Sequence, residues 1–244
     1  MKKSMVRIWI IDKNTILITL YVIIFITVAM SNISFSSHSI PDSKNNLKGK
    51  TIVIDAGHGG IDGGTNIDNI LEKNINLNIT REITHILKTN KANVILTRDS
   101  DISLDNLYKS QDTRYKRDLN ARVNIINSNK ADLFISIHAN CLLNDVSENG
   151  TMVFYQGTGS PSNCLAENVM FFINKIDYAN IKRKLHSPQI GNYYILKNAK
   201  IPGVIVETGF ISNKDDSYLL TSDDFKHKIS KAICIGINEY FKKP

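Results

Sequence analysis

The chain has 244 residues, of which 42% are hydrophobic and 22% charged, a composition typical of a globular protein and not of a disordered one. Once an N-terminal leader is set aside, this length suits one well-buried domain and is too short for two. Four basic residues against Asp12 place +3 of the formal charge of +7 in the first 13 positions. The remaining +4 suits an anionic polymer, but the chain lacks the dense basic stripe and interleaved aromatic residues of a nucleic-acid binder.

Residues 1–31 have the pattern of a signal peptide. A basic start is followed by fifteen uncharged residues, Ile16 to Met30. This run matches a signal-peptide core and is shorter than the roughly 20 residues that span a bilayer. Ala29-Met30-Ser31 offers a cleavage site, and retention as a signal anchor is the alternative. In both cases we expect export, with membrane contact only through this segment, and a linker over residues 32–49.

The next part of the chain is expected to alternate strands and helices. A continuous β-branched run predicts a buried strand at Thr51–Ala56, and an apolar stripe at helical spacing predicts a helix at Glu72–Thr89. A second strand is expected at Asn93–Thr97, followed by a long polar loop over Ser100–Lys116. Asp118 is predicted to cap a helix whose apolar residues face inward.

The alternation continues to the end of the chain. Strands are expected at Asp132–His138, Thr151–Tyr155, Tyr193–Leu196 and Val204–Glu207, helices from Ser160 to about Lys175 and at Asp223–Phe241, and an irregular segment at Asp177–Asn192. This order predicts a single domain of the α/β class, over residues 50–244, with a mostly parallel twisted sheet and helices on both faces.

Three polar residues follow apolar runs at predicted strand ends. They are His58, His138 and Glu207. Ligand sites of open α/β sheets form beyond the carboxyl ends of the strands, so these side chains can converge although they are far apart in sequence. Two imidazoles and one carboxylate leave a zinc coordination position free for water, and a further carboxylate can act as general base. By spacing alone, the ligating carboxylate can be Glu72, Asp62 or Asp68.

Glu207 stands out on physical grounds. A carboxylate directly after an apolar strand is costly to bury unless it is paired, ligating or catalytic. Its neighbours from Val204 to Val206 are all β-branched.

The chain carries a series of short motifs, which are Ile54–Gly60 with Asp62 and Gly64, Glu72, Thr97–Asp99, Arg122 with Asn127, Ser136–Asn140 and Val206–Asn213. In this order, and over the range from Lys50 to about Tyr240, they resemble the zinc-dependent N-acetylmuramoyl-L-alanine amidases of bacterial cell walls, the Amidase_3 family. Asp118 and Cys141 depart from the family pattern, and neither is a proposed ligand.

The resemblance implies Zn²⁺ bound by His58, Glu72 and His138, with Glu207 as the catalytic residue. Glu207 would take a proton from the attacking water and deliver it to the leaving amine. The implied substrate is peptidoglycan, cut between the lactyl group of N-acetylmuramic acid and L-alanine of the stem peptide. The stretch Tyr193–Val204 is similar to that of spore-cortex, germination-specific amidases. A vegetative autolysin or division amidase is the alternative within the family.

Four further residues or groups have less certain roles. Asn140 can contact substrate or hold the histidine loop. Arg98 and Arg122 can form structural bridges with Asp99, Asp118 or other acids, and anchoring a peptide carboxylate is the functional alternative for both. Lys182, Arg183 and Lys184 are expected to be a solvated surface cluster.

Rival functions are weakened by particular residues. A cysteine hydrolase would need Cys141 beside His138, but no helix N-terminus is evident there to lower the thiol pKa. The three cysteines show no CxxC spacing and indicate isolated thiols. No G-x-S-x-G elbow supports a serine hydrolase. A non-catalytic wall-binding module should have lost a ligand or the base, whereas all are present. The absence of wall-binding repeats predicts that a protein partner or the N-terminal segment supplies localisation or activation.

Overall fold

The computed structural model describes residues 12–14, 21, 45–157, 159–178 and 180–242. The chain divides into two compact units, residues 1–38 and 39–244, and the second contains the whole α/β domain. Most of the expected signal segment and most of the expected linker lie outside the described residues. Within those residues, no helix has the length and apolarity needed to cross a membrane.

A six-stranded sheet forms the centre of the domain, in the order β4-β1-β5-β8-β6-β7. Four neighbouring pairs are parallel, and β6 runs antiparallel to β8. The expectation of a mostly parallel sheet is therefore confirmed. The strands are β1 Thr51–Ala56, β4 Asn93–Leu96, β5 Leu133–Asn140, β6 Met152–Tyr155, β7 Gln189–Ile190 and β8 Gly203–Phe210.

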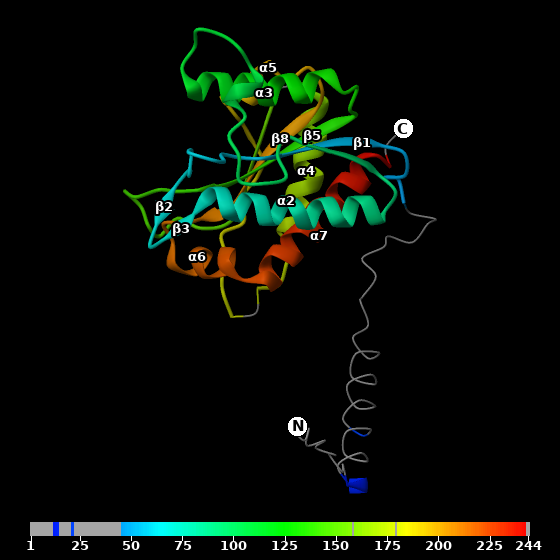
Figure 1. Cartoon of the computed structure of the whole chain (residues 1–244), viewed down its shortest axis with the longest axis vertical. Coiled ribbons are helices and arrows are strands. Elements are labelled where there is room, and N and C mark those ends of the chain that lie inside the picture. The colour runs from blue at the N-terminus through cyan, green and yellow to red at the C-terminus, as the bar shows by residue number, and fades with distance from the viewer. Residues whose placement is uncertain (1–11, 15–20, 22–44, 158, 179, 243–244) are drawn as a thin grey trace, which may run out of the picture. The chain divides into compact units, whose positions relative to one another are not determined.

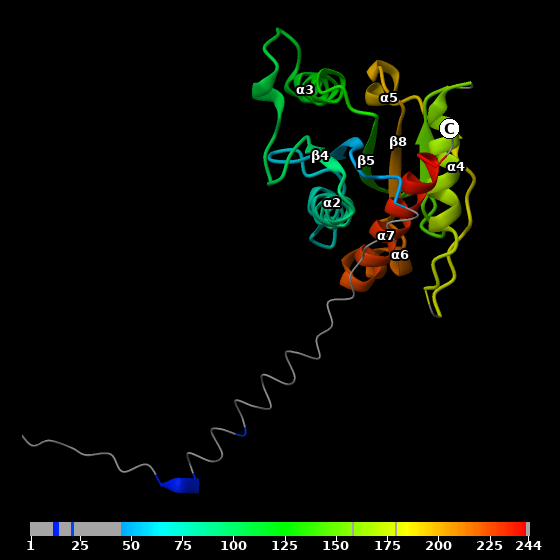
Figure 2. The ribbon, with the colours of Figure 1, turned by 90° about the vertical axis from the view of Figure 1, so that its right-hand side faces the viewer.

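Helices cover both faces of the sheet (Figures 1 and 2). Successive residues of β1 point to opposite faces, so Ile52 and Ile54 join the larger core while Val53 joins the smaller one. The larger core lies against α2 Glu72–Thr89, α4 Pro161–Ile173, α6 Lys214–Thr221 and α7 Asp223–Tyr240, and the smaller against α3 Arg114–Ser128 and α5 Tyr194–Asn198. Figure 2 shows α3 and α5 on one side of the sheet, with α2 and α7 on the other.

Two local expectations were wrong. The segment Tyr193–Leu196 is not a strand, because helix α5 occupies it. Adjacent Ile195 and Leu196 are both buried in the smaller core, which the alternating side chains of a strand would not allow. Asp118 does not cap α3, since the helix begins at Arg114 and Thr113 accepts the capping hydrogen bond.

Several short elements lie where no helix or strand was predicted. They are the hairpin of β2 Asn66–Ile67 and β3 Ile70–Leu71, the 3-10 turn Asp105–Leu107, strand β7 and helix α6. Strand β8 also continues beyond Glu207, because Phe210 pairs with Asn140 after an irregularity in β5. Glu207 is therefore held within a strand, paired in register with His138.

Candidate metal centre

His58 follows β1 in a backbone conformation that is rare for a residue with a side chain. Its φ is +61°. This turn brings His58 Nε2 to 3.1 Å from Glu72 Oε1, while Nδ1 lies 2.9 Å from Asp62 Oδ2. One ring nitrogen is thus directed at Glu72 and the other is oriented by a second carboxylate.

Glu72 begins α2 and is 4% exposed. The same oxygen that faces His58 lies 3.1 Å from Nδ1 of His138 in β5. The backbone N–H groups of Thr65 and Ala139 also donate to the Glu72 carboxylate. Elements far apart in sequence therefore converge on one carboxylate.

Two glycines allow this convergence. A Cβ atom at Gly57 would lie 2.2 Å from Cε1 of His138, and one at Gly64 would lie 2.6 Å from Oε2 of Glu72. Both distances are too short for non-bonded atoms. Glycine lets the backbone approach the ligand side chains at these positions.

The cluster has the donor set of a zinc site. The candidate ligand atoms of His58, Glu72 and His138 all lie within 4.8 Å of one another. Two imidazole nitrogens and a carboxylate oxygen suit Zn²⁺ with an open position. The contact of Asp62 with the other nitrogen of His58 is the kind that orients a ligating histidine. Asp68 instead lies between β2 and β3, with a positive φ.

The charges of the cluster favour a deprotonated carboxylate. Burial would raise the pKa of Glu72, but hydrogen bonds and charge interactions with His138 and His58 hold it well below its ordinary value. Burial would lower the pKa of His58, but the hydrogen bond and charge of Glu72, followed by those of Asp62, raise it to about 9. A metal at this site must therefore displace a proton from His58.

Glu207 has the environment expected of a general base. It is 7% exposed, and β8 holds it beside His138 of β5. Burial raises its pKa to about 7, partly opposed by His138 and assisted by the negative charge of Glu72. A carboxyl group with a pKa near neutrality can both accept and return a proton.

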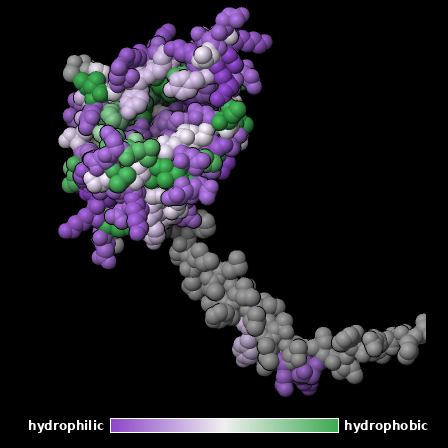
Figure 3. All heavy atoms as spheres, turned by 90° about the vertical axis from the view of Figure 1, so that its left-hand side faces the viewer, coloured by the Kyte–Doolittle hydropathy of each residue, from purple (hydrophilic) through white to green (hydrophobic). Residues whose placement is uncertain are grey.

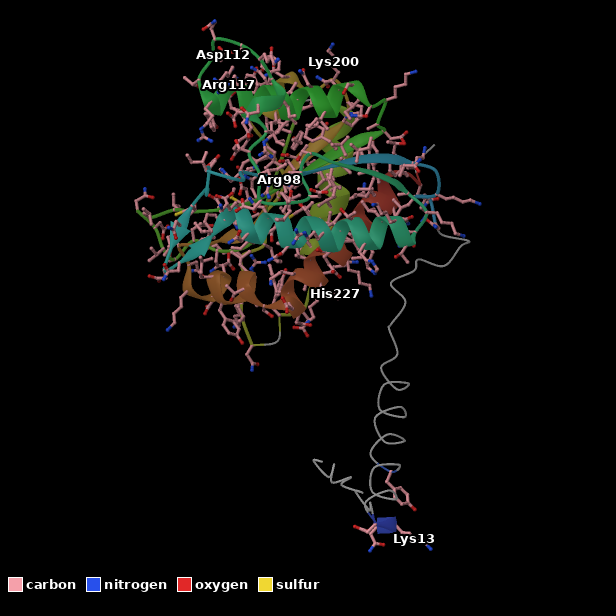
Figure 4. All side chains as sticks on the ribbon, in the orientation of Figure 1. Lys13, Arg98, Asp112, Arg117, Lys200 and His227 are labelled. Atoms are coloured by element: carbon pink, nitrogen blue, oxygen red, sulfur yellow. The ribbon has the colours of Figure 1, made fainter. Side chains whose placement is uncertain are left out.

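The candidate substrate residues are engaged in local bonds. Asn140 Oδ1 accepts from the N–H of Cys141, which holds the turn after β5. Arg98 is 2% exposed, and its guanidinium donates to the backbone carbonyls of Ala56, Gly57, Ser100 and Lys73. Figure 4 shows Arg98 inside the body of the domain, whereas Arg117 lies at the outer end of α3. The surroundings of Arg98 favour its structural interpretation over a substrate contact.

Arg122 forms a structural bridge, as one interpretation of the sequence anticipated. It pairs with Asp118 and also with Asp55, both at 2.6 Å. Asp55 was missed by sequence reasoning. Its burial would raise its pKa, but Arg122 and the hydroxyls of Ser136 and Thr97 lower it to about 2. The available signal was a carboxylate within a buried β-branched strand, the same signal that identified Glu207.

The expected surface cluster at residues 182–184 was wrong for its central member. The side chain of Arg183 is 3% exposed and pairs with Asp216 at 2.7 Å. Asp216 also accepts from the backbone N–H groups of Gly150 and Phe210. The pair therefore fastens the loop before β7 to the end of β8. Cys141, Cys164 and Cys234 form no disulfide bond among the described residues, as the isolated spacing predicted.

Between His58 and Glu72 the chain forms β2 and β3, which lie at the left of Figure 1. Figure 3 looks onto that side of the molecule, where apolar patches stand among hydrophilic residues.

Comparison with known proteins identifies the family. The family model for N-acetylmuramoyl-L-alanine amidase (Amidase_3) matches residues 52–239, which contain every residue of the candidate centre. The chain belongs to this family of peptidoglycan amidases.

Relatives and solved structures agree with this assignment. The chain is 33% identical to a germination-specific N-acetylmuramoyl-L-alanine amidase of Bacillus subtilis, over 86% of both chains. It is 36% identical to the amidase LytC of the same organism, over 82% of this chain and 37% of that one. The fold is similar to the CwlD amidase of Clostridioides difficile, solved with the GerS lipoprotein, with a TM-score of 0.71, 35% identity and coverage of 80% and 100%.

Proposed function

We propose that this amidase is zinc-dependent and cleaves the bond between N-acetylmuramic acid and L-alanine of the stem peptide in spore-cortex peptidoglycan. The observation that carries the metal assignment is the convergence of His58, Glu72 and His138 within 4.8 Å. The register that pairs Glu207 with His138 supports its assignment as the base.

The residues of the chain divide the chemistry between them. Bound Zn²⁺ would supply Lewis acidity at the scissile amide. Glu207 accepts the proton of the attacking water and returns it to the leaving amine, a role that its raised pKa permits. Asp62 keeps the ring of His58 in the orientation that presents Nε2.

The cortex assignment rests on one relative, which is named as germination-specific and whose length is matched over 86%. Removal of the stem peptide would leave a free lactyl carboxylate on muramic acid. A deacetylase acting on the same sugar would expose the amine that closes with this carboxylate into muramic-δ-lactam. The product of the amidase itself is the peptide-free muramic acid.

A vegetative autolysin is the second candidate. The amidase LytC, which is 36% identical to this chain, supports it, because the name of that relative does not specify germination.

The proposed localisation follows from the pattern of the N-terminal segment. Residues 1–31 serve as a signal peptide or a membrane anchor, and residues 32–49 form a linker. Residues 50–244 form the catalytic domain, which acts on the wall outside the cytoplasm. The complex of the similar CwlD amidase with a lipoprotein supports a protein partner for this chain.

We expect the protein from Asn45 onward to bind one zinc ion and to release intact stem peptides from purified wall. Mass spectrometry of the digest reports the bond that is cut. A chelator should abolish this release, whereas alkylation of the thiols should leave it largely intact, because Cys141 is not assigned to the chemistry. Chelator-resistant and alkylation-sensitive release would assign the reaction to Cys141. A protein with neither zinc nor turnover would be a wall-binding module.

Spores that lack the protein should contain cortex without muramic-δ-lactam and should germinate poorly. The physical reason is that the lactam cannot close while the stem peptide occupies the lactyl carboxyl group. Cortex composition by chromatography of muramidase digests gives the measurement. Normal lactam content together with a separation or autolysis defect in growing cells would favour the vegetative role.

A further inference from the structure

The carbonyl oxygens of three consecutive residues, Ala56, Gly57 and His58, accept hydrogen bonds from side chains distant in sequence. Arg122 donates from Nη1 to the oxygen of Ala56 at 2.8 Å and from Nη2 to that of His58 at 2.6 Å. Arg98 donates from Nε to the oxygen of Ala56 and from Nη2 to that of Gly57, both at 2.9 Å. Two guanidinium groups therefore hold the segment that carries a candidate ligand.

A third side chain reaches the same segment from helix α2. Asn76 Nδ2 donates to the oxygen of Gly57 at 3.2 Å and to Glu72 Oε1 at 3.3 Å. Asn76 is fully buried, and its Oδ1 has no hydrogen-bond partner among the described residues. Because burying an unpartnered oxygen is costly, the two bonds from Nδ2 must offset it. We call Asn76, Arg98 and Arg122 the carbonyl clamp.

The clamp acts on a backbone that would otherwise relax. His58 has a φ of +61°, which a residue with a side chain adopts at a steric cost. Such conformations persist where the surrounding contacts hold them in place. This conformation places Nε2 of His58 at 3.1 Å from Glu72 Oε1. The Asp62 side chain contacts the ring of His58 and orients the imidazole, and its backbone exchanges two hydrogen bonds with Gly59 on the far side of His58 from the clamp.

Arg122 is itself held rigidly. It is 2% exposed, and its charge is balanced by Asp55 and Asp118. Asp55 in turn accepts hydrogen bonds from the hydroxyls of Thr97 and Ser136, both at 2.6 Å. A guanidinium group presents its donors in a planar fork, whereas lysine offers a single point charge. Lysine could not bond both carboxylates and two carbonyls from this place.

We propose that the carbonyl clamp positions His58 as a metal ligand, with Arg122 as its principal positioning residue. The inference rests on the proposed zinc-dependent function. Hydrogen bonds that orient ligating residues typically contribute roughly 10–100-fold to metal affinity. Here the hydrogen bonds go to the backbone of Ala56, Gly57 and His58. The clamp therefore sets the position of the His58 backbone, whereas the Asp62 carboxylate sets the rotation of the imidazole ring.

Arg122→Lys in the full chain tests the clamp. We expect zinc affinity, measured by competition with a chromogenic chelator, to fall by about 10–100-fold. The visible absorption of the Co²⁺-loaded protein should also change, because it reports the geometry of the ligands. Arg117→Lys is the matched control on the same helix, since Arg117 pairs with Asp105 and does not touch the clamped segment. The control should keep wild-type affinity and spectrum.

Asn76→Ala provides a second variant that leaves both guanidinium groups in place. It should weaken zinc binding, whereas Asn78→Ala, at an exposed position of the same helix, should not. Melting of the metal-free proteins separates positioning from stability. Folded Arg122→Lys and Asn76→Ala variants with wild-type zinc affinity and Co²⁺ spectrum would overturn the clamp, whatever their melting temperatures. A wild-type chain that binds no zinc would instead reject the zinc-dependent function together with the clamp.

Discussion

Replacing Glu207 with glutamine is expected to lower turnover by about 10²–10⁴-fold, the usual contribution of a general base. The amide has nearly the size of the carboxylate but cannot take a proton from water. Zinc content should stay at the wild-type level, because the candidate metal cluster comprises His58, Glu72 and His138. Release of stem peptides from purified wall, with metal analysis of the same sample, gives both quantities.

Glu167→Gln, at an exposed position of α4, is the matched control and should keep wild-type turnover. Loss of zinc in the Glu207 variant would move that residue into the ligand set. Full turnover of the Glu207 variant with zinc retained would show that Glu207 is not the general base.

The same substitution has a predicted pH signature in the metal-free protein. Burial raises the pKa of Glu207 from 4.5 to about 7, so the folded state binds the proton more tightly than the unfolded state. The stability that this provides is fully present below pH 4.5 and is lost as pH rises to about 7. A shift of this size corresponds to roughly 3 kcal/mol. Metal-free Glu207→Gln should therefore melt above the wild type at pH 8, with a smaller difference at pH 4.

Alanine at His58, Glu72 or His138 is expected to remove most of the bound zinc and, with it, the amidase activity. Each substitution deletes one of three convergent ligand atoms. The loss of affinity should exceed the roughly 10–100-fold that is typical when a ligand loses only its hydrogen-bond partner. Chelator competition and turnover on purified wall measure the two losses. His85→Ala, at an exposed position of α2, should change neither.

Zinc binding to the wild type should also depend on pH. The pKa of His58 is raised to about 9 in the metal-free cluster, mainly through Glu72 once the opposing effect of burial is overcome. Binding below this pH must release the proton, so affinity should fall about tenfold per unit as pH decreases. Affinity independent of pH between 6 and 8 would contradict this linkage, and retained zinc in the His138 variant would contradict the ligand set.

Local sequence patterns were enough to predict most strands and helices of this protein and three residues of its candidate site. The strands were predicted from β-branched runs, because buried parallel strands have apolar neighbours on both faces. His58, His138 and Glu207 were predicted as site residues because each follows such a run. The helices Glu72–Thr89 and Asp223–Tyr240 followed from apolar spacing. The resemblance to the amidase family rested on the same strings, and the family match agrees with it.

Tertiary structure alone separated Glu72 from Asp62 and Asp68 on physical grounds. The choice depends on a contact between residues 66 positions apart, which no local periodicity encodes. The same holds for the burial of Arg183 against Asp216 and for the helix at Tyr194–Asn198, where packing overrode the local pattern. Sequence periodicity reports which face of an element is buried, whereas packing decides which side chain it meets there. Packing also decides the strained turn of His58 and the carbonyl clamp that holds it, because their hydrogen bonds join the end of β1 to α2, α3 and the end of β4.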